Sequence, residues 1–169
     1  MKADLSDNGI ELLSEYEGNR PSMYDDATGK TISDPSDATG YPTIGIGHKL
    51  TSTELKRGTI KIGEMEVDWQ KKLTPDQTKE LVLQDLKHAV KAVEKNVDVE
   101  LTQNQFDALV SFAFNIGSSA FKNAGAIKAL NAGNMDDFLR RHAQWNKSNG
   151  RKMAGLVNRR ASEAELFKA

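Results

Sequence analysis

At 169 residues, with 38% hydrophobic and 28% charged positions, the chain has the length and composition of one ordered globular domain and not of a disordered segment. Its 23 basic and 24 acidic residues give a net charge of −1, so no overall positive field favours nucleic acid or an anionic membrane as a partner. The lack of cysteine excludes disulfides and thiolate metal sites.

The first expected element is a helix that Ser6 or Asp7 caps and Gly18 ends, with Glu17 in its last turn. From residue 23 to residue 69, glycines and turn residues separate the short β-type runs YPTIGIG, GTIKIG and MEVDW. This pattern predicts a small β-rich lobe with long loops.

A helical period returns with Pro75 at a first helical position, and apolar residues recur at three- and four-residue steps as far as Val97. A second helix is predicted between Thr102 and Gly117, followed by shorter helical patterns and a last helix that ends near Phe167.

The order of these elements predicts an α+β fold in which strands and helices are segregated. We expect a single domain over residues 1–169, with a β-rich lobe over about 18–70 and a helical lobe over about 5–17 and 74–168. The junction of the two lobes is where a cleft would form.

Three polar residues suggest a chemistry for that cleft. Glu17 stands at a helix C-terminus, where the helix dipole disfavours an acid, so a partner or a function should compensate. Asp26 lies early in the β-rich lobe, and Thr43 opens the run TIGIGH, whose glycines allow close approach to the backbone. Two carboxyl groups and a hydroxyl suit glycoside cleavage, although spacing alone does not distinguish them from solvated surface groups.

The run EGNRPSMYDD at residues 17–26, followed by TIGIGH at residues 43–48, resembles the phage-type lysozymes (endolysins) of the T4 lysozyme family. The resemblance continues through LTPDQTKELVLQDL, LTQNQFDALVSFAFNIGSSAF, ALNAGN and QWNKSNGRKMAGLVNRRASEAELF, from about Leu5 to Phe167. It implies a lysozyme-like fold with the active-site cleft between the two lobes.

By this resemblance Glu17 is the general acid, Asp26 the residue that positions or activates water, and Thr43 its hydroxyl helper. The implied reaction is hydrolysis of the β-1,4 bond between N-acetylmuramic acid and N-acetylglucosamine, with inversion at the sugar carbon and without a cofactor or metal. Asp25 and Asp34 remain alternatives to Asp26, because an insertion over residues 27–42 stands where the family has a tight hairpin.

The resemblance implies further residues of the site. Arg159 would reach Glu17 and hold its carboxylate by charge-assisted hydrogen bonds, whereas without the resemblance Arg159 and Arg160 read as surface arginines. The run SFAFNIG resembles the family helix that lines the cleft floor, which makes Phe114 and Asn115 candidate sugar contacts.

His48 is expected to support the structure, because the three histidines of the chain show no metal-binding spacing. Its expected partner is Asp85, in the helix that should pack below the β-rich lobe.

The resemblance implies a phage endolysin: a monomeric muramidase whose partner is bacterial peptidoglycan and which needs a holin for its release. Since the sequence has no apolar run of the length that an export signal or a membrane span needs, we expect synthesis in the host cytoplasm without a signal peptide, no stable membrane insertion, and action on the wall in the periplasm. A lytic transglycosylase and a non-catalytic peptidoglycan-binding or structural domain are alternatives. A secreted effector or a prophage remnant also fits.

Overall fold

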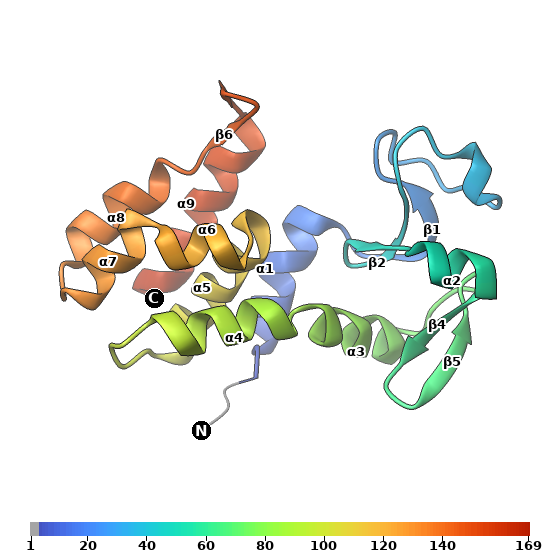
Figure 1. The fold of residues 1–169 in the computed structure, drawn as a ribbon, viewed down its shortest axis with the longest axis horizontal. Coiled ribbons are helices and arrows are strands. Elements are labelled where there is room, and N and C mark those ends of the chain that lie inside the picture. Colours follow the sequence, from blue (N-terminus) through green and yellow to red (C-terminus); the bar gives the residue numbers. More distant parts are fainter. Residues whose placement is uncertain (1–3) are drawn as a thin grey trace. The chain divides into compact units, whose positions relative to one another are not determined.

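The computed structural model describes residues 4–169, whose internal contacts divide them into two compact units (Figure 1). The β-rich unit is Leu13–Asp85. The helical unit contains the described residues up to Leu12 and Leu86–Ala169. Helix α1 (Asp7–Glu17) contributes residues to both units. Among residues 4–169, no helix combines the length and the apolar character that a membrane span requires.

The β-rich unit is built on an antiparallel sheet of three strands in the order β1-β2-β3. These strands are β1 (Arg20–Asp25), β2 (Pro42–Gly45) and β3 (His48–Lys49). Tyr24 pairs with Thr43, and Thr43 pairs with Lys49 on the other side. The remaining elements of this unit are a 3-10 turn (Pro35–Asp37), α2 (Ser52–Arg57), the hairpin of β4 (Thr59–Ile62) and β5 (Met65–Asp68), and α3 (Pro75–Asp85).

Apolar side chains from both small sheets and from α3 form the core of the β-rich unit. Its buried members are Met23, Ile44, Leu50, Ile60, Ile62, Trp69, Leu73 and Leu81. Because the apolar positions alternate along β4, Ile60 and Ile62 face this core while Lys61 is exposed.

After residue 86, the described part of the helical unit contains six helices, and a short hairpin precedes the last of them. They are α4 (Lys87–Asn96), α5 (Gln103–Ile116), α6 (Ser118–Asn123), α7 (Gly125–Asn131), α8 (Met135–Ala143) and α9 (Ala154–Lys168), and the hairpin joins β6 (Lys147–Ser148) to β7 (Arg151–Lys152). Helix α5 packs against α4 and α9. Phe112 of α5 is fully buried, and its ring lies 5.9 Å from that of Phe121.

The α+β class is confirmed, and several expected boundaries differ. The helical period that runs to Val97 contains two helices, α3 and α4, which meet at Leu86. Helix α3 packs against β2, β3 and β4, so it belongs to the β-rich unit and not to the helical lobe in which it was expected. The period is continuous because both helices bury an apolar face, and Leu86 makes no side-chain capping bond that would mark the break.

Helix α2 was not predicted, although its start carries a clear local signal. The Thr51 hydroxyl accepts from the Glu54 amide, and the Glu54 carboxylate accepts from the Thr51 amide, which is a capping box. Gly58 ends the helix in the left-handed region at φ 75°.

Candidate active site

Glu17 is the last residue of α1, and its side chain lies against the turn between β2 and β3. Gly18 follows in the left-handed region at φ 79°, and the Tyr24 hydroxyl donates to the Glu17 carbonyl at 3.4 Å. A Cβ atom on Gly47 would lie 3.2 Å from both Cβ and Oε2 of Glu17. The glycine of TIGIGH therefore allows the close approach that the sequence predicted, and the approaching group is the Glu17 side chain.

Asp26 directly follows β1, and the backbone of Tyr41 holds it on two sides. The Asp26 amide donates to the Tyr41 carbonyl at 3.2 Å, and the Tyr41 amide donates to Asp26 Oδ1 at 2.6 Å. A Cβ atom on Gly40 would overlap Oδ1 of Asp26, so a glycine is required beside the carboxylate. The main chain at positions 40 and 41 thus confines the Asp26 carboxylate at its Oδ1 oxygen.

Thr43 is buried, and its hydroxyl donates to the same Tyr41 carbonyl at 2.9 Å. The peptide groups of Tyr41 therefore connect Asp26 and Thr43, which the sequence had proposed as partners across the insertion. Because the Thr43 hydroxyl donates its proton in this bond, its oxygen can only accept a hydrogen bond from a further group.

Asp25, an alternative to Asp26, has a structural role in the inserted segment 27–42. Its carboxylate is 2% exposed and accepts from the amide and hydroxyl of Thr39, the amides of Ala27 and Gly40 and the hydroxyl of Thr28, at 2.7–3.2 Å. The hydrogen bond from the Thr39 side chain, together with the other bonds and against the effect of burial, holds the pKa of Asp25 well below its usual range.

Asp34, the other alternative, caps the 3-10 turn. Its Oδ1 accepts from the Ser36 amide at 2.8 Å and from the Ser36 hydroxyl at 2.7 Å, and these bonds lower the pKa of Asp34. Both alternatives are therefore engaged in local structure of the insertion.

His48 forms the expected hydrogen bond to Asp85, with Nδ1 2.8 Å from Oδ2. A second partner, Glu54, was not predicted from the sequence, and its Oε2 lies 3.0 Å from Nε2 of His48. Burial lowers the pKa of His48, but the hydrogen bonds and charges of Asp85 and Glu54 outweigh burial and raise it from 6.5 to about 9. The capping box at Thr51 was the sequence signal that could have placed Glu54 beside the strand that carries His48.

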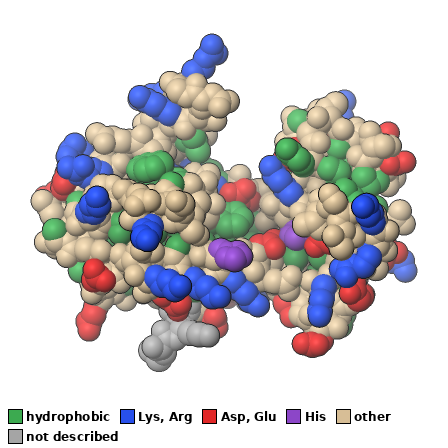
Figure 2. Space-filling model, viewed as in Figure 1, with side chains coloured by type: hydrophobic (Ala, Val, Ile, Leu, Met, Phe, Trp, Pro, Cys, Tyr) green, Lys and Arg blue, Asp and Glu red, His purple; other side chains and the backbone are tan. Residues whose placement is uncertain are grey.

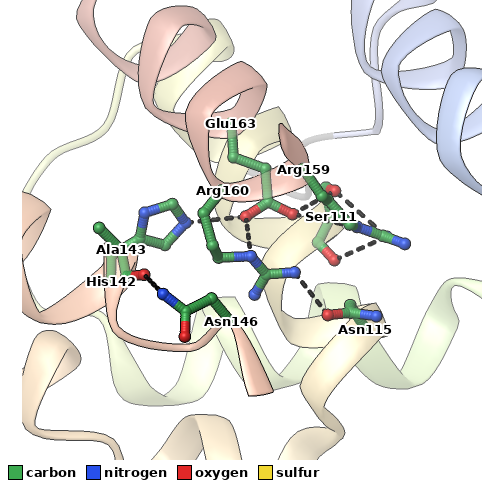
Figure 3. A network of polar contacts seen from close by, with 8 residues as sticks. All are labelled: Ser111, Asn115, His142, Ala143, Asn146, Arg159, Arg160 and Glu163. Atoms are coloured by element: carbon green, nitrogen blue, oxygen red, sulfur yellow. Dashed lines mark hydrogen bonds and ion pairs between the residues drawn. The ribbon is translucent and has the colours of Figure 1, made fainter. Parts of the chain in front are cut away.

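The helical unit contains a buried charged network centred on Glu163 (Figure 3). Glu163 is 1% exposed, and its Oε1 accepts from the Ser111 hydroxyl at 2.7 Å and from Arg159 Nε at 3.3 Å. Its Oε2 lies 2.8 Å from His142 Nε2 and 3.2 Å from Arg160 Nε. Arg159 and Arg160 are therefore buried residues and not surface arginines.

The network reaches one of the expected sugar contacts. Arg160 donates to Oδ1 of Asn115 (Figure 3). Its guanidinium lies over the ring of Phe112, with Cζ 4.8 Å from the ring centre. Phe114 and Asn115 are both partly buried near the end of α5. Their contact with a sugar, and the expected contact of Arg159 with Glu17, stay predictions.

A pocket of about 400 Å³ opens in the helical unit near the end of α8. It is lined by Gly125, Ala126, Arg141, Gln144, Trp145 and Lys147. Trp145 is 37% exposed. This pocket was not predicted from the sequence, because its walls come from two separate segments, residues 125–126 and 141–147.

Residues 14–163 match the family that is described as phage lysozyme. The endolysin of Salmonella phage P22 is 34% identical over 163 residues, which cover 96% of this chain and 97% of that protein. The endolysin of Bacillus phage B103 is 34% identical over 97% of this chain, but the match covers 54% of its own length. The chain therefore spans about half the length of the Bacillus phage relatives.

Two solved structures share the fold. A crystal structure of a P22 lysozyme mutant is 32% identical, aligns with a TM-score of 0.76 and covers 99% of both chains. The muramidase domain of SpmX from Asticaccaulis excentricus is 31% identical, aligns with a TM-score of 0.70 and covers 98% of both chains.

Proposed function

Because this chain belongs to the phage lysozyme family, we propose that it is a muramidase, a glycoside hydrolase that cuts the β-1,4 bond between N-acetylmuramic acid and N-acetylglucosamine in peptidoglycan. The observation that carries the proposal is the connection of Asp26 to Thr43 through the Tyr41 peptide groups. Through this connection the Asp26 carboxylate and the Thr43 hydroxyl are held together in the β-rich unit, which also contains Glu17.

In the proposed reaction, Asp26 and Thr43 position the attacking water. Both side chains present acceptor oxygens, so they take the two hydrogens of one water and turn its lone pair toward the sugar carbon. The water oxygen attacks that carbon as the glycosidic bond breaks, and Asp26 receives the proton that the water loses.

Glu17 is the proposed general acid, which donates its proton to the leaving sugar oxygen. The Gly47 backbone restricts the carboxyl group on one side, which limits its freedom before the reaction. We assign Arg159 the support of this carboxyl group, and Phe114 and Asn115 the binding of sugars. Because Oδ1 of Asn115 accepts from Arg160, its amide N–H groups would donate to the sugar.

Water attack on the face opposite the leaving group predicts inversion at the sugar carbon. An inverting enzyme holds its two carboxyl groups about 6.5–9.5 Å apart, and a retaining enzyme holds them at about 5–5.5 Å. Proton NMR of the first product formed distinguishes the outcomes, since inversion yields the α anomer from a β linkage.

The central experiment compares wild type with Glu17→Gln on purified peptidoglycan and on Gram-negative cells stripped of their outer membrane. Glu15→Gln is the matched control, because it removes one carboxylate from an exposed position of the same helix. We expect reducing muramic ends from wild type and Glu15→Gln, and loss of cleavage in a folded Glu17→Gln. Cleavage that survives in Glu17→Gln would mean that another group is the acid.

The same fragments test the alternatives. Anhydro-muramic ends would identify a lytic transglycosylase, which needs no Asp26 and Thr43 pair. Binding to the wall without any cleavage by wild type would identify a binding or structural domain.

We also propose that the protein is a monomeric phage endolysin, made in the host cytoplasm and released to the wall through a holin. Some relatives carry the name SAR-endolysin, among them a protein of Escherichia phage Mu that is 30% identical over 131 residues. Expression with and without a holin tests this route, because lysis without a holin would contradict it.

A further inference from the structure

Lys49, a residue of β3 that the sequence analysis did not consider, lies beside the proposed water-holding pair. Its ammonium nitrogen is 3.4 Å from Oδ2 of Asp26 and 4.5 Å from the centre of the Tyr41 ring. In the sheet, Lys49 pairs with Thr43. One lysine is thus next to Thr43 through its backbone and next to Asp26 through its side chain.

The two oxygens of the Asp26 carboxylate are held from different directions. The Tyr41 amide holds Oδ1 at 2.6 Å, and the Lys49 ammonium faces Oδ2. A carboxylate that is held at one oxygen can still rotate about its side-chain bonds, whereas two contacts restrict that rotation. The orientation of the remaining lone pairs then depends on both contacts.

Folding stability does not account for this arrangement. The Lys49 side chain is 60% exposed and that of Asp26 is 27% exposed, and exposed ion pairs contribute little to stability. A free lysine side chain also has many conformations. The ring of Tyr41 attracts the ammonium on its face and so favours the conformation in which Lys49 reaches Asp26.

We propose that Lys49 is a positioning residue, which orients the Asp26 carboxylate so that it can receive a proton from the attacking water. This inference rests on the proposed muramidase function and on the role of Asp26 in it. Tyr41 takes part twice, because its amide holds one carboxylate oxygen and its ring holds the ammonium that faces the other.

The first test is the steady-state kinetics of Lys49→Gln on a soluble peptidoglycan fragment. We expect kcat to fall roughly tenfold with little change in KM, because a displaced catalytic group slows the chemical step. Lys49→Arg keeps the positive charge and should recover most of the lost rate. A rise in KM at constant kcat would show that Lys49 binds the substrate directly and would overturn the proposal.

Lys61→Gln is the matched control. Lys61 is an exposed lysine on β4 of the same unit, so this variant has the same change in net charge without the contact to Asp26. If Lys61→Gln slows the reaction as much as Lys49→Gln, the effect is one of overall charge toward the wall and the positioning role is wrong.

A double-mutant cycle tests whether Lys49 acts through Asp26. In an Asp26→Asn background, Lys49→Gln should cause no further loss of kcat. An equal loss in both backgrounds would contradict the proposal. Inactivity of wild type would refute the muramidase function itself, whereas an active wild type, an inactive Glu17→Gln and an unaffected Lys49→Gln would refute the role of Lys49 alone.

Discussion

Nδ1 of His48 lies 2.8 Å from Oδ2 of Asp85, so a side chain of β3 is bonded to the last residue of α3. Because the pKa of His48 rises from 6.5 to about 9 in the folded state, its contribution to stability is complete below about pH 6.5 and is lost as the pH rises through 9. This increase in pKa corresponds to at most about 3 kcal/mol of folding stability.

Asp85→Asn should therefore lower the free energy of unfolding by about 1–3 kcal/mol at pH 6 and by less above pH 9. Glu54→Gln should act in the same direction, because a glutamine keeps the capping box but removes one charge from His48. Urea unfolding at pH 6 and at pH 9.5 measures both effects. A constant loss at both pH values would show that the charge of His48 is not involved.

Gly47→Ala should reduce both stability and activity. Its φ of 71° makes an alanine cost about 1–2 kcal/mol, and the added Cβ would press on the Glu17 side chain, so we expect kcat to fall about tenfold. Gly58→Ala is the control, because Gly58 has a φ of 75° and no atom would lie within 4 Å of its Cβ. Equal loss of activity in both variants would contradict a steric effect on Glu17.

Asp25→Asn should loosen the inserted segment 27–42, because the amides and hydroxyls that it binds lose a charged acceptor. Trypsin should then cleave faster after Lys30, while Asp37→Asn, an exposed change in the same segment, should have little effect. Since the pKa of Asp25 is lowered from 3.8, the stabilisation is present above about pH 3.8 and is lost as the pH falls below it.

Hydrogen exchange of the Thr39 and Gly40 amides measures the same loss directly. Protection that is unchanged between pH 5 and pH 2 would contradict the role of the Asp25 carboxylate.

Glu163→Gln should destabilise the helical unit by about 3–5 kcal/mol, because it removes the buried negative charge that Arg159 and Arg160 contact. Glu165→Gln, an exposed change in the same helix, should alter stability by less than about 0.5 kcal/mol. Chemical denaturation measures the free energy of unfolding of both variants. Similar losses in the two would mean that the charge of Glu163 does not stabilise the helical unit.

The lysozyme-like fold was predictable because the motifs that resemble the family extend over nearly the whole chain, and the family match and the two solved structures confirm it. The pairing of His48 with Asp85 was also expected correctly. These residues carry distinctive side chains at positions that the motifs indicate.

Other contacts in the site could not be predicted from the types of side chain in the sequence. Tyr41 connects Asp26 to Thr43 through an amide and a carbonyl, which every residue except proline possesses. The break at Leu86 is hidden because the apolar period continues from α3 into α4, although the two helices belong to different units. The burial of Glu163 was not predicted, because a glutamate in a helix is ordinarily exposed.

The two ends of the inserted segment meet, since Asp26 and Tyr41 bond each other twice. The chain between them leaves and returns at one point of the sheet, and a longer or shorter chain adds little closure entropy. Residues 29–38, which exclude Gly40 and the groups that bond the Asp25 carboxylate, therefore form an exchangeable module. An engineer can graft another sequence into this module, while the carboxylate and the hydroxyl at its base keep their geometry.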